Sequence, residues 1–490
     1  MPNNYSFKII PDFLNNSVRN FPDKIGLVFE EREYSYKKIK EKANSIASYI
    51  VKKTKKGDIV ALFLENRPEI IFSYFGILSA GRIVLLIPAN ISDDNFLFQI
   101  KKTNPKLIIS QKKFEQKLKR TGILKEYFYT DIDEIPQSSF FAGEDVSGND
   151  VSTIIFTSGT MAEPKGVVLR HCNVISATKN ITEFLKWSKY DIDVNILSLS
   201  HSFGLGNIHC VLAAGATVIL FRDAINIKKI IQTIIEKKAT TFAAVPAILR
   251  FVVDNYFEEF KKCGEFLRFV QTDTSLMDKE LIEKVLSALP NTDFNYYYGL
   301  TEASRSTFFS INKHLDKINS IGKALFNVEI KVVDEYGKDL PAGKAGEICI
   351  KGGHVIKEYW RCPEASKNIK DGWLKTGDVG FIDKDGYLYF KSRKDDVINV
   401  SGEKVSPEEI EEVVRKMPGV KDVAAVGAKD RLLGEAVKLF IVPDASDFDV
   451  QSVVQECKKK LESYKVPKLI EVIEKIPRTE NGKVRRNILK

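Results

Sequence analysis

The sequence predicts an α/β protein with a large N-terminal domain, residues 1–394, and a small α+β domain, residues 395–490. Short apolar strands alternate with amphipathic helices through the first half, which is typical of parallel sheets covered by helices. After about Asn327, short alternating strands between glycine turns predict an antiparallel β region. From Asp395 the pattern changes to mixed helices and strands, so we place the domain boundary after Lys394.

The composition is that of an ordinary globular protein. Of 490 residues, 44% are hydrophobic and 28% are charged, which excludes wholesale disorder and fibrous repeats. The net charge of +9 has no dominant block, which is typical of a solvated surface, and we expect no nucleic-acid partner. Six scattered cysteines contain no CxxC pair, which favours a reducing, cytoplasmic location over a disulfide framework or zinc site.

The N-terminal region predicts neither a signal peptide nor a membrane span. The segment MPNNYSFKIIPDFL has no basic stretch followed by an apolar run. The most apolar early stretch, Ile70 to Ile91, is interrupted by Gly76, Gly81, Arg82 and Pro88. It therefore predicts a buried helix followed by a strand.

The elements of the first half follow from the spacing of apolar residues. Helical spacing and unbroken apolar runs predict, in order, helices at 36–53, 68–80 and 92–102 and strands at 58–64, 83–87 and 106–110. The same rhythm recurs with strands at 194–198, 217–221 and 241–244 and helices near 208–213 and at 227–237. In the C-terminal domain we predict helices at 407–416 and 450–461 and strands at 420–426 and 436–442.

The polar motif TSGTMAEPKG, residues 157–166, is typical of an anion-binding loop. It follows an apolar strand at 151–156 and precedes a helix near Asn173. Its candidate phosphate donors are Thr157, Ser158, Gly159, Thr160 and Lys165. The spacing differs from the Walker pattern, so no P-loop fold is implied, and a plain Ser/Thr/Gly turn is the alternative.

Three further motifs carry candidate binding residues. In YYYGLTE, Tyr298 can stack on a base, Thr301 can bond a phosphate oxygen and Glu302 can hold Mg²⁺; core tyrosines at a strand end are the alternative. In WLKTGD and GYLYFKSRKDD, Asp378 can accept hydrogen bonds from the two hydroxyls of a ribose, and Arg393 can add a donor. In PRTENGKVRR, Lys483 follows a glycine turn and can reach into a cleft; a solvated basic tail is the alternative.

In their order along the chain, these motifs together with GEICIKG resemble those of the adenylate-forming superfamily, which includes acyl- and aryl-CoA synthetases, peptide-synthetase adenylation domains and luciferases. The resemblance covers nearly the whole chain, from Tyr36 to Lys483. It implies two αβ lobes plus a β region in the N-terminal domain, and a small mobile C-terminal domain. It also implies an acid–thiol ligase that uses ATP and Mg²⁺ to convert a carboxylic acid to an acyl-adenylate, releases pyrophosphate, and transfers the acyl group to a thiol.

The resemblance also implies the role of each motif residue. The loop from Thr157 to Lys165 holds the β- and γ-phosphates of ATP. The other implied roles are adenine stacking for Tyr298, the α-phosphate contact for Thr301, magnesium binding for Glu302, ribose binding for Asp378 and Arg393, bridging of the carboxylate and α-phosphate for Lys483, the hinge for Asp395, and the thiol-acceptor loop for Gly402 and Lys404.

Two segments depart from the family pattern. Met161-Ala162 stand where the family usually has a hydroxyl residue and a glycine, so one phosphate donor is lost. A nucleotide-binding protein with little turnover is therefore an alternative of a different class. The segment TDTSLM, Thr272 to Met277, replaces a Gly/Ala-rich stretch, and its bulkier side chains are expected to narrow the adenylate or acyl pocket.

The segment LSHSFGLGN, 199–207, matches the family region that lines the acyl pocket. It carries no acidic residue to pair with a substrate amine, so we expect an amine-free carboxylic acid. His201 and Phe203 are candidate pocket residues, with a core histidine as the alternative for His201, and Gly204 and Gly206 are expected to leave room for an acyl chain or ring. CoA is the expected acceptor; the alternative is the phosphopantetheine thiol of a carrier protein bound in trans.

Overall fold

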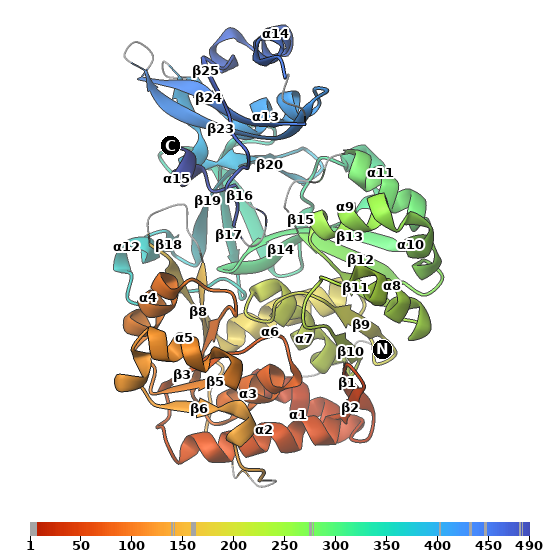
Figure 1. Cartoon of the computed structure of the whole chain (residues 1–490), viewed down its shortest axis with the longest axis vertical. Helices are drawn as coiled ribbons and strands as arrows, with labels where there is room; N and C mark the ends of the chain where they lie inside the picture. Colours follow the sequence, from red (N-terminus) through yellow and green to blue (C-terminus); the bar gives the residue numbers. More distant parts are fainter. Residues whose placement is uncertain are drawn as a thin grey trace.

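The computed structural model describes residues 7–138, 141, 143–157, 163–273, 277, 279–400, 403–430, 434–444, 448–479, 482 and 484–490. Within these residues the strands form four sheets. None of the described helices is both long and apolar enough to span a membrane. Figure 1 shows the two largest sheets and their helices in the lower and middle parts of the molecule, with the C-terminal elements in a separate lobe at the top.

The largest sheet has the strand order β15-β14-β13-β12-β11-β9-β10-β1-β2 among the described residues. Its inner strands pair in parallel, and the hairpins β1–β2 and β13–β14 and the pair β14–β15 are antiparallel. Its strands are β1 (Ile25–Phe29), β2 (Arg32–Ser35), β9 (Ile192–Asn195), β10 (Thr217–Leu220), β11 (Thr241–Ala243), β12 (Phe269–Asp273), β13 (Asp293–Leu300), β14 (Ala303–Ser310) and β15 (Lys323–Ala324).

The second sheet has the order β6-β5-β3-β4-β7-β8 and is parallel except for the hairpin β7–β8. Its strands are β3 (Ile59–Phe63), β4 (Ile83–Ile87), β5 (Leu107–Ser110), β6 (Tyr129–Asp131), β7 (Val151–Thr157) and β8 (Lys165–Arg170). Alternate residues of β3 belong to two separate apolar clusters: Val60 and Leu62 to one, Ala61 and Phe63 to the other. Because both faces of this sheet are covered, the strand is continuously apolar in sequence.

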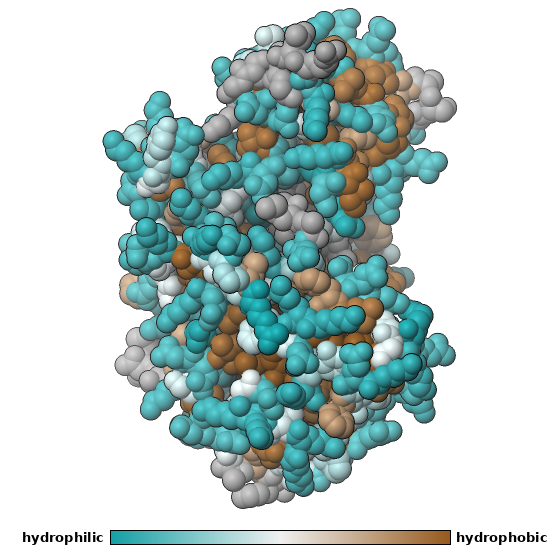
Figure 2. All heavy atoms as spheres, turned by 90° about the vertical axis from the view of Figure 1, so that its left-hand side faces the viewer, coloured by the Kyte–Doolittle hydropathy of each residue, from teal (hydrophilic) through white to brown (hydrophobic). Residues whose placement is uncertain are grey.

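Helices cover both parallel sheets, as the alternation of strands and helices predicted. They are α1 (Pro11–Asn20), α2 (Tyr36–Val51), α3 (Pro68–Ser79), α4 (Asp93–Thr103), α5 (Glu115–Arg120), α6 (His171–Phe184), α7 (Ser202–Ala214), α8 (Ile227–Glu236), α9 (Pro246–Asn255), α10 (Phe257–Cys263) and α11 (Lys279–Ala288). Figure 2 shows one face of the molecule, where hydrophilic side chains predominate over scattered hydrophobic ones.

The predicted antiparallel β region is present as a third sheet. It contains β16 (Val328–Val333), β17 (Gly346–Gly352), β18 (Ile369–Lys370), β19 (Trp373–Ile382) and β20 (Leu388–Arg393), with the short helix α12 (Pro363–Ser366) beside it. All of its described pairings are antiparallel.

The C-terminal elements form a small α+β unit with its own core. They are β21 (Ile398–Val400), β22 (Glu403–Val405), α13 (Pro407–Arg415), β23 (Val420–Asp430), β24 (Gly434–Pro443), α14 (Val450–Lys460), β25 (Leu469–Val472) and α15 (Arg486–Leu489). Apolar side chains such as Ile410, Val423, Leu439 and Val453 pack together apart from the clusters of the N-terminal part. The fold class predicted from the sequence is confirmed, whereas the boundary after Lys394 stays a prediction.

Two local predictions differ from the structure by several residues. The strand predicted at 194–198 ends at Asn195, because the Asn195 side chain accepts a hydrogen bond from Leu197 N at 3.0 Å and turns the backbone. The helix predicted near 208–213 begins earlier, at Ser202. Strand β8 was not predicted, although its valines 167 and 168 favour an extended backbone beside β7.

Candidate active site

An ion pair between Asp378 and Arg393 lies where β19 meets β20. The two residues are direct cross-strand partners, and Arg393 Nε lies 2.8 Å from Asp378 Oδ1. The Asp378 side chain is 1% exposed and that of Arg393 is 31% exposed, so the guanidinium lies nearer the surface than the carboxylate. Burial alone disfavours the charged guanidinium, but the surrounding carboxylates raise the pKa of Arg393 overall, so it stays a cation.

Tyr298 joins this ion pair from a different sheet. Its hydroxyl donates to Asp378 Oδ2 at 2.6 Å, although the two residues belong to β13 and β19. Burial and the adjacent Asp378 carboxylate raise the pKa of Tyr298 well above its ordinary value, so the phenol keeps its proton. The residues predicted to hold adenine and ribose are therefore in direct contact.

Glu302 lies in the turn between β13 and β14, next to Thr301. Its Oε1 accepts a hydrogen bond from Tyr359 Oη at 3.0 Å, and its backbone oxygen accepts one from Ile356 N. Burial raises the pKa of Glu302, while Tyr359 and the nearby cations Arg393 and Lys165 oppose the shift. A partly buried carboxylate near cations is suited to polyanionic ligands and their counter-ions.

Lys165 begins β8 and lies directly opposite Thr157, the last residue of β7. Its Nζ lies 6.0 Å from the centroid of the Tyr359 ring, within cation–π range. Lys165 is therefore held on a strand of a hairpin, close to the Tyr359–Glu302 pair. Ser158, Gly159 and Thr160 lie outside the described residues.

Tyr359 was not anticipated from the sequence. It precedes Trp360 in a segment without a recognisable motif, and only the folded chain brings it to Glu302. Because its ring is near Lys165 and its hydroxyl bonds Glu302, it links the predicted phosphate loop to the predicted magnesium ligand.

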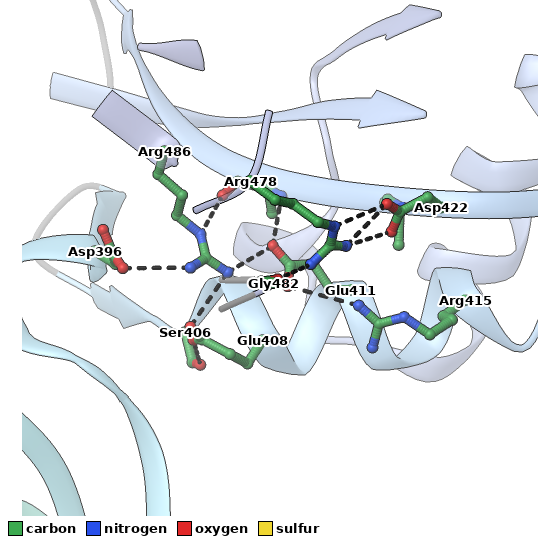
Figure 3. Close-up of polar contacts among 11 residues, drawn as sticks. Asp396, Ser406, Glu408, Glu411, Arg415, Asp422, Arg478, Gly482 and Arg486 are labelled. Carbon is green, nitrogen blue, oxygen red and sulfur yellow. Dashed lines mark hydrogen bonds and ion pairs between the residues drawn. The ribbon is translucent and has the colours of Figure 1, made fainter. Parts of the chain in front are cut away.

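The predicted hinge lies in a short 3₁₀ turn, Lys394–Asp396. Figure 3 shows Arg486 facing Asp396 and the acidic residues of α13. Arg486 Nη1 lies 3.3 Å from Asp396 Oδ2, and Lys490 Nζ donates to Asp395 O at 3.2 Å. Arg486 and Lys490 are thus bonded to the predicted hinge segment. Lys483 and Gly402 lie outside the described residues, and the backbone of Lys404 pairs with Asn399 in the β21–β22 hairpin.

The predicted acyl-pocket segment forms the start of α7, where His201 is half-buried and burial lowers its pKa. The expectation that Gly204 and Gly206 leave room is wrong for this structure. An added Cβ would lie 2.4 Å from Ser198 O at Gly204 and 2.3 Å from Arg305 Nη1 at Gly206. The glycines instead allow close approach of the backbone and of a buried arginine.

Two family models match the chain. That of AMP-binding enzymes matches residues 14–360, and that of the AMP-binding enzyme C-terminal domain matches residues 409–483. The chain belongs to the AMP-binding enzyme family.

Individual relatives extend along almost the whole of this AMP-binding enzyme. The long-chain-fatty-acid–CoA ligase of Escherichia coli O6:H1 is 27% identical, over 99% of this chain and 94% of that protein. The 2-succinylbenzoate–CoA ligase of Enterococcus faecalis is 27% identical, over 97% of each.

Solved structures also match this chain over almost its whole length. The structure of o-succinylbenzoate CoA synthetase (MenE) from Bacillus subtilis, in complex with the acyl-adenylate intermediate OSB-AMP, has a TM-score of 0.90 at 25% identity over 98% of each chain. The same synthetase with ATP and a magnesium ion has a TM-score of 0.87 at 26% identity, over 97% of this chain and 98% of that one. These likenesses confirm the adenylate-forming superfamily, its CoA synthetase branch and the expected fold, and they agree with ATP and Mg²⁺ as cofactors.

Proposed function

We propose that this AMP-binding enzyme activates an amine-free carboxylic acid with ATP and transfers the acyl group to CoA. The enzyme class, an AMP-forming acid–CoA ligase, follows from the family and from relatives that are CoA ligases. One observation carries the proposal for this chain: Tyr359 bonds Glu302 and lies within cation–π range of Lys165, while Asp378 is bonded to both Arg393 and Tyr298. Groups of the kinds that bind phosphates, a divalent cation, a ribose and a base therefore adjoin one another.

The first half-reaction joins two anions, so it depends on positioning and charge neutralisation. A carboxylate oxygen of the acid attacks the α-phosphorus of ATP, and the bond to the bridging oxygen of pyrophosphate breaks. We assign Thr157 and Lys165 to the β- and γ-phosphates, Thr301 to the α-phosphate, and Lys483 to the carboxylate and α-phosphate. No side chain acts as a nucleophile.

The nucleotide is held at its other end by three residues. We assign Tyr298 to the adenine and the Asp378–Arg393 pair to the ribose. The contact between Tyr298 and Asp378 supports this assignment, because the base and the sugar of one nucleotide adjoin each other.

The carboxylate of Glu302 fits a magnesium ion, which prefers one or two carboxylates plus phosphate oxygens. Tyr359 bonds Oε1 and orients the carboxylate, and no cation of the described residues forms an ion pair with Glu302. When bound, the ion supplies neutralisation of phosphate charge.

In the second half-reaction the thiol sulfur attacks the acyl carbon and AMP leaves with the bonding electrons. We assign Gly402 and Lys404 to the loop that meets the thiol acceptor. We assign Asp395 to a hinge about which the C-terminal domain rotates between the orientations used in the two half-reactions. We place the reaction in the cytoplasm.

Pyrophosphate release with a panel of carboxylic acids tests the proposal. ATP- and acid-dependent release is expected, followed by thioester formation with CoA. Binding of ATP without release would instead favour the nucleotide-binding alternative, and thioester formation only with a carrier protein would favour the ligase that acts in trans.

A further inference from the structure

Arg305 is a buried arginine that the proposed reaction does not use. It lies in β14, three residues after Glu302, and is 2% exposed. Its φ is +51°, a left-handed conformation that is uncommon for residues other than glycine. Gly299 allows the backbone of Arg305 to approach closely, since a Cβ there would lie 2.3 Å from the backbone nitrogen of Arg305.

The guanidinium of Arg305 is held in place by α7 and β13. Its Nη2 donates to Phe203 O at 3.0 Å and to Asn207 Oδ1 at 2.8 Å. Its Cζ lies 5.0 Å from the ring centroids of both Phe203 and Tyr297. This arrangement fixes the direction of the cation through aromatic faces and neutral oxygens.

Several hydrogen-bonding atoms around Arg305 are unused. Among the described residues, Nε and Nη1 of Arg305 and Nδ2 of Asn207 have no hydrogen-bond partner. Gln271, which donates to Asn207 Oδ1 at 3.2 Å, likewise has no described partner for Oε1. Buried donors without acceptors are costly, and this cluster contains three.

The positive charge of Arg305 is also poorly neutralised. No carboxylate of the described residues forms an ion pair with it, and the nearby Asp193 is bonded through Oδ1 to Thr241 at 2.7 Å. Burial raises the pKa of Asp193 to about 7, so this group carries only part of a charge at neutral pH. A cation buried without an anion is expensive unless an anion arrives from outside.

The cluster lies just below residues that solvent reaches. Phe203 and Gly206 on α7 and Gly299 after Tyr298 are all partly exposed, and all three contact Arg305. Three residues of extended chain span at most about 10 Å, so the backbone of Arg305 is no further than this from that of Glu302. This separation is of the order of the length of an acid with a few carbon atoms.

We propose that Arg305 and Asn207 bind a second carboxylate at the far end of the acid, which makes the substrate a short dicarboxylic acid. This inference rests on the proposed function, in which the first carboxylate is adenylated beside Glu302. A distal carboxylate supplies acceptor oxygens for the unpartnered donors. It also supplies a negative charge to pair with the guanidinium of Arg305. A purely hydrocarbon acid supplies neither.

The wild-type enzyme tests the inference with matched acids: butanoate against butanedioate, hexanoate against hexanedioate, and benzoate against benzene-1,4-dicarboxylate. Pyrophosphate release is measured with ATP and Mg²⁺. We expect kcat/KM to favour at least one dicarboxylate over its partner by about 100-fold or more, because a site with buried polar groups rejects analogues that leave them unpaired. A preference for monocarboxylates throughout would overturn the inference and leave the proposed function standing. Pyrophosphate release in the absence of any added acid would overturn both the inference and the proposed function.

Two variants assign the preference to the side chain. Arg305→Met keeps the length and removes the charge, so the dicarboxylate preference should fall by at least about 30-fold while turnover of monocarboxylates persists. Arg305→Lys should retain part of the preference. Arg222→Met, at an arginine whose side chain is 53% exposed, is the matched control and should behave as wild type. Thermal melting with and without ATP identifies misfolded variants. If Arg305→Met is misfolded, the inference is judged from the wild-type panel of acids and from Arg305→Lys. Equal losses for both classes of acid in a folded Arg305→Met enzyme would show a structural role only.

Discussion

The Tyr298 hydroxyl donates to Asp378 Oδ2 at 2.6 Å, and this bond joins the largest sheet to the antiparallel sheet that precedes the predicted hinge. Both side chains are almost completely buried. The nucleotide end of the proposed site is therefore built on two sheets whose relative position this hydrogen bond helps to fix.

Tyr298→Phe removes the hydroxyl and keeps the ring. We expect the free energy of unfolding to fall by about 1.5–3 kcal/mol, because a hydrogen bond to a buried carboxylate is lost. Stacking on adenine should survive, so the free energy of ATP binding should change by less than the free energy of unfolding. Denaturant unfolding and ATP titration measure the two effects. Tyr336→Phe is the control, since Tyr336 is 89% exposed; equal stability of the two variants would contradict the prediction.

Glu302→Gln keeps the size of the side chain and removes its charge. The Mg²⁺ concentration for half-maximal pyrophosphate release should rise, with slower turnover, because phosphate charge is less well neutralised. Burial raises the pKa of Glu302, so the wild-type Mg²⁺ requirement should also increase as the pH falls through that raised pKa, and the variant should lack this dependence. Glu335→Gln, at an exposed position, is the control. An unchanged Mg²⁺ titration would remove Glu302 from the metal site.

Lys483→Ala should affect the first half-reaction selectively. Adenylate formation is expected to fall by about 100-fold or more, since a charge at the α-phosphate is lost in the transition state. Thioester formation from pre-made acyl-adenylate should persist. Lys475→Ala, on the exposed surface of the same domain, should leave both steps intact. Near wild-type adenylation by the Lys483 variant would refute the assigned role.

Asp395→Pro should uncouple the two half-reactions. Proline fixes φ near −65° and so denies the backbone freedom that a hinge needs. Adenylate formation should persist while thioester formation collapses, and Gly402→Leu should give a similar split by blocking the acceptor. Asp395→Ala, which removes only the side chain, should support both steps. Equal losses in both steps, in parallel with a lower Tm, would instead indicate a charged surface turn without hinge function.

Glu408 should make stability depend on pH. It lies 3.2 Å from Arg486 in the cluster of Figure 3, and burial raises its pKa to about 7. Between pH 4.5 and 7 the folded protein then keeps a proton that the unfolded chain releases, so the free energy of unfolding should fall as pH rises and level off above pH 7. Glu408→Gln should remove about 3 kcal/mol of this change, since each unit of pKa difference corresponds to about 1.4 kcal/mol. If the free energy of unfolding changes with pH in the same way for the wild type and Glu408→Gln, Glu408 is not the group that titrates.

The sequence by itself determined the rhythm of strands and helices and the chemistry of the motifs. Unbroken apolar runs such as the one at Ile83–Ile87 become buried strands because both faces of the parallel sheet are covered, so every side chain of the run is buried. Tyr298, Glu302, Asp378 and Arg393 were all named from their motifs.

Only the tertiary structure brought Tyr359 to Glu302 and placed Arg305 against the Phe203 and Tyr297 rings. It also showed that the space beside Gly206 is filled by Arg305. These contacts join residues that are far apart in the chain, and they depend on how sheets and helices pack against one another. Packing of this kind has no local period, so no pattern of neighbouring residues records it.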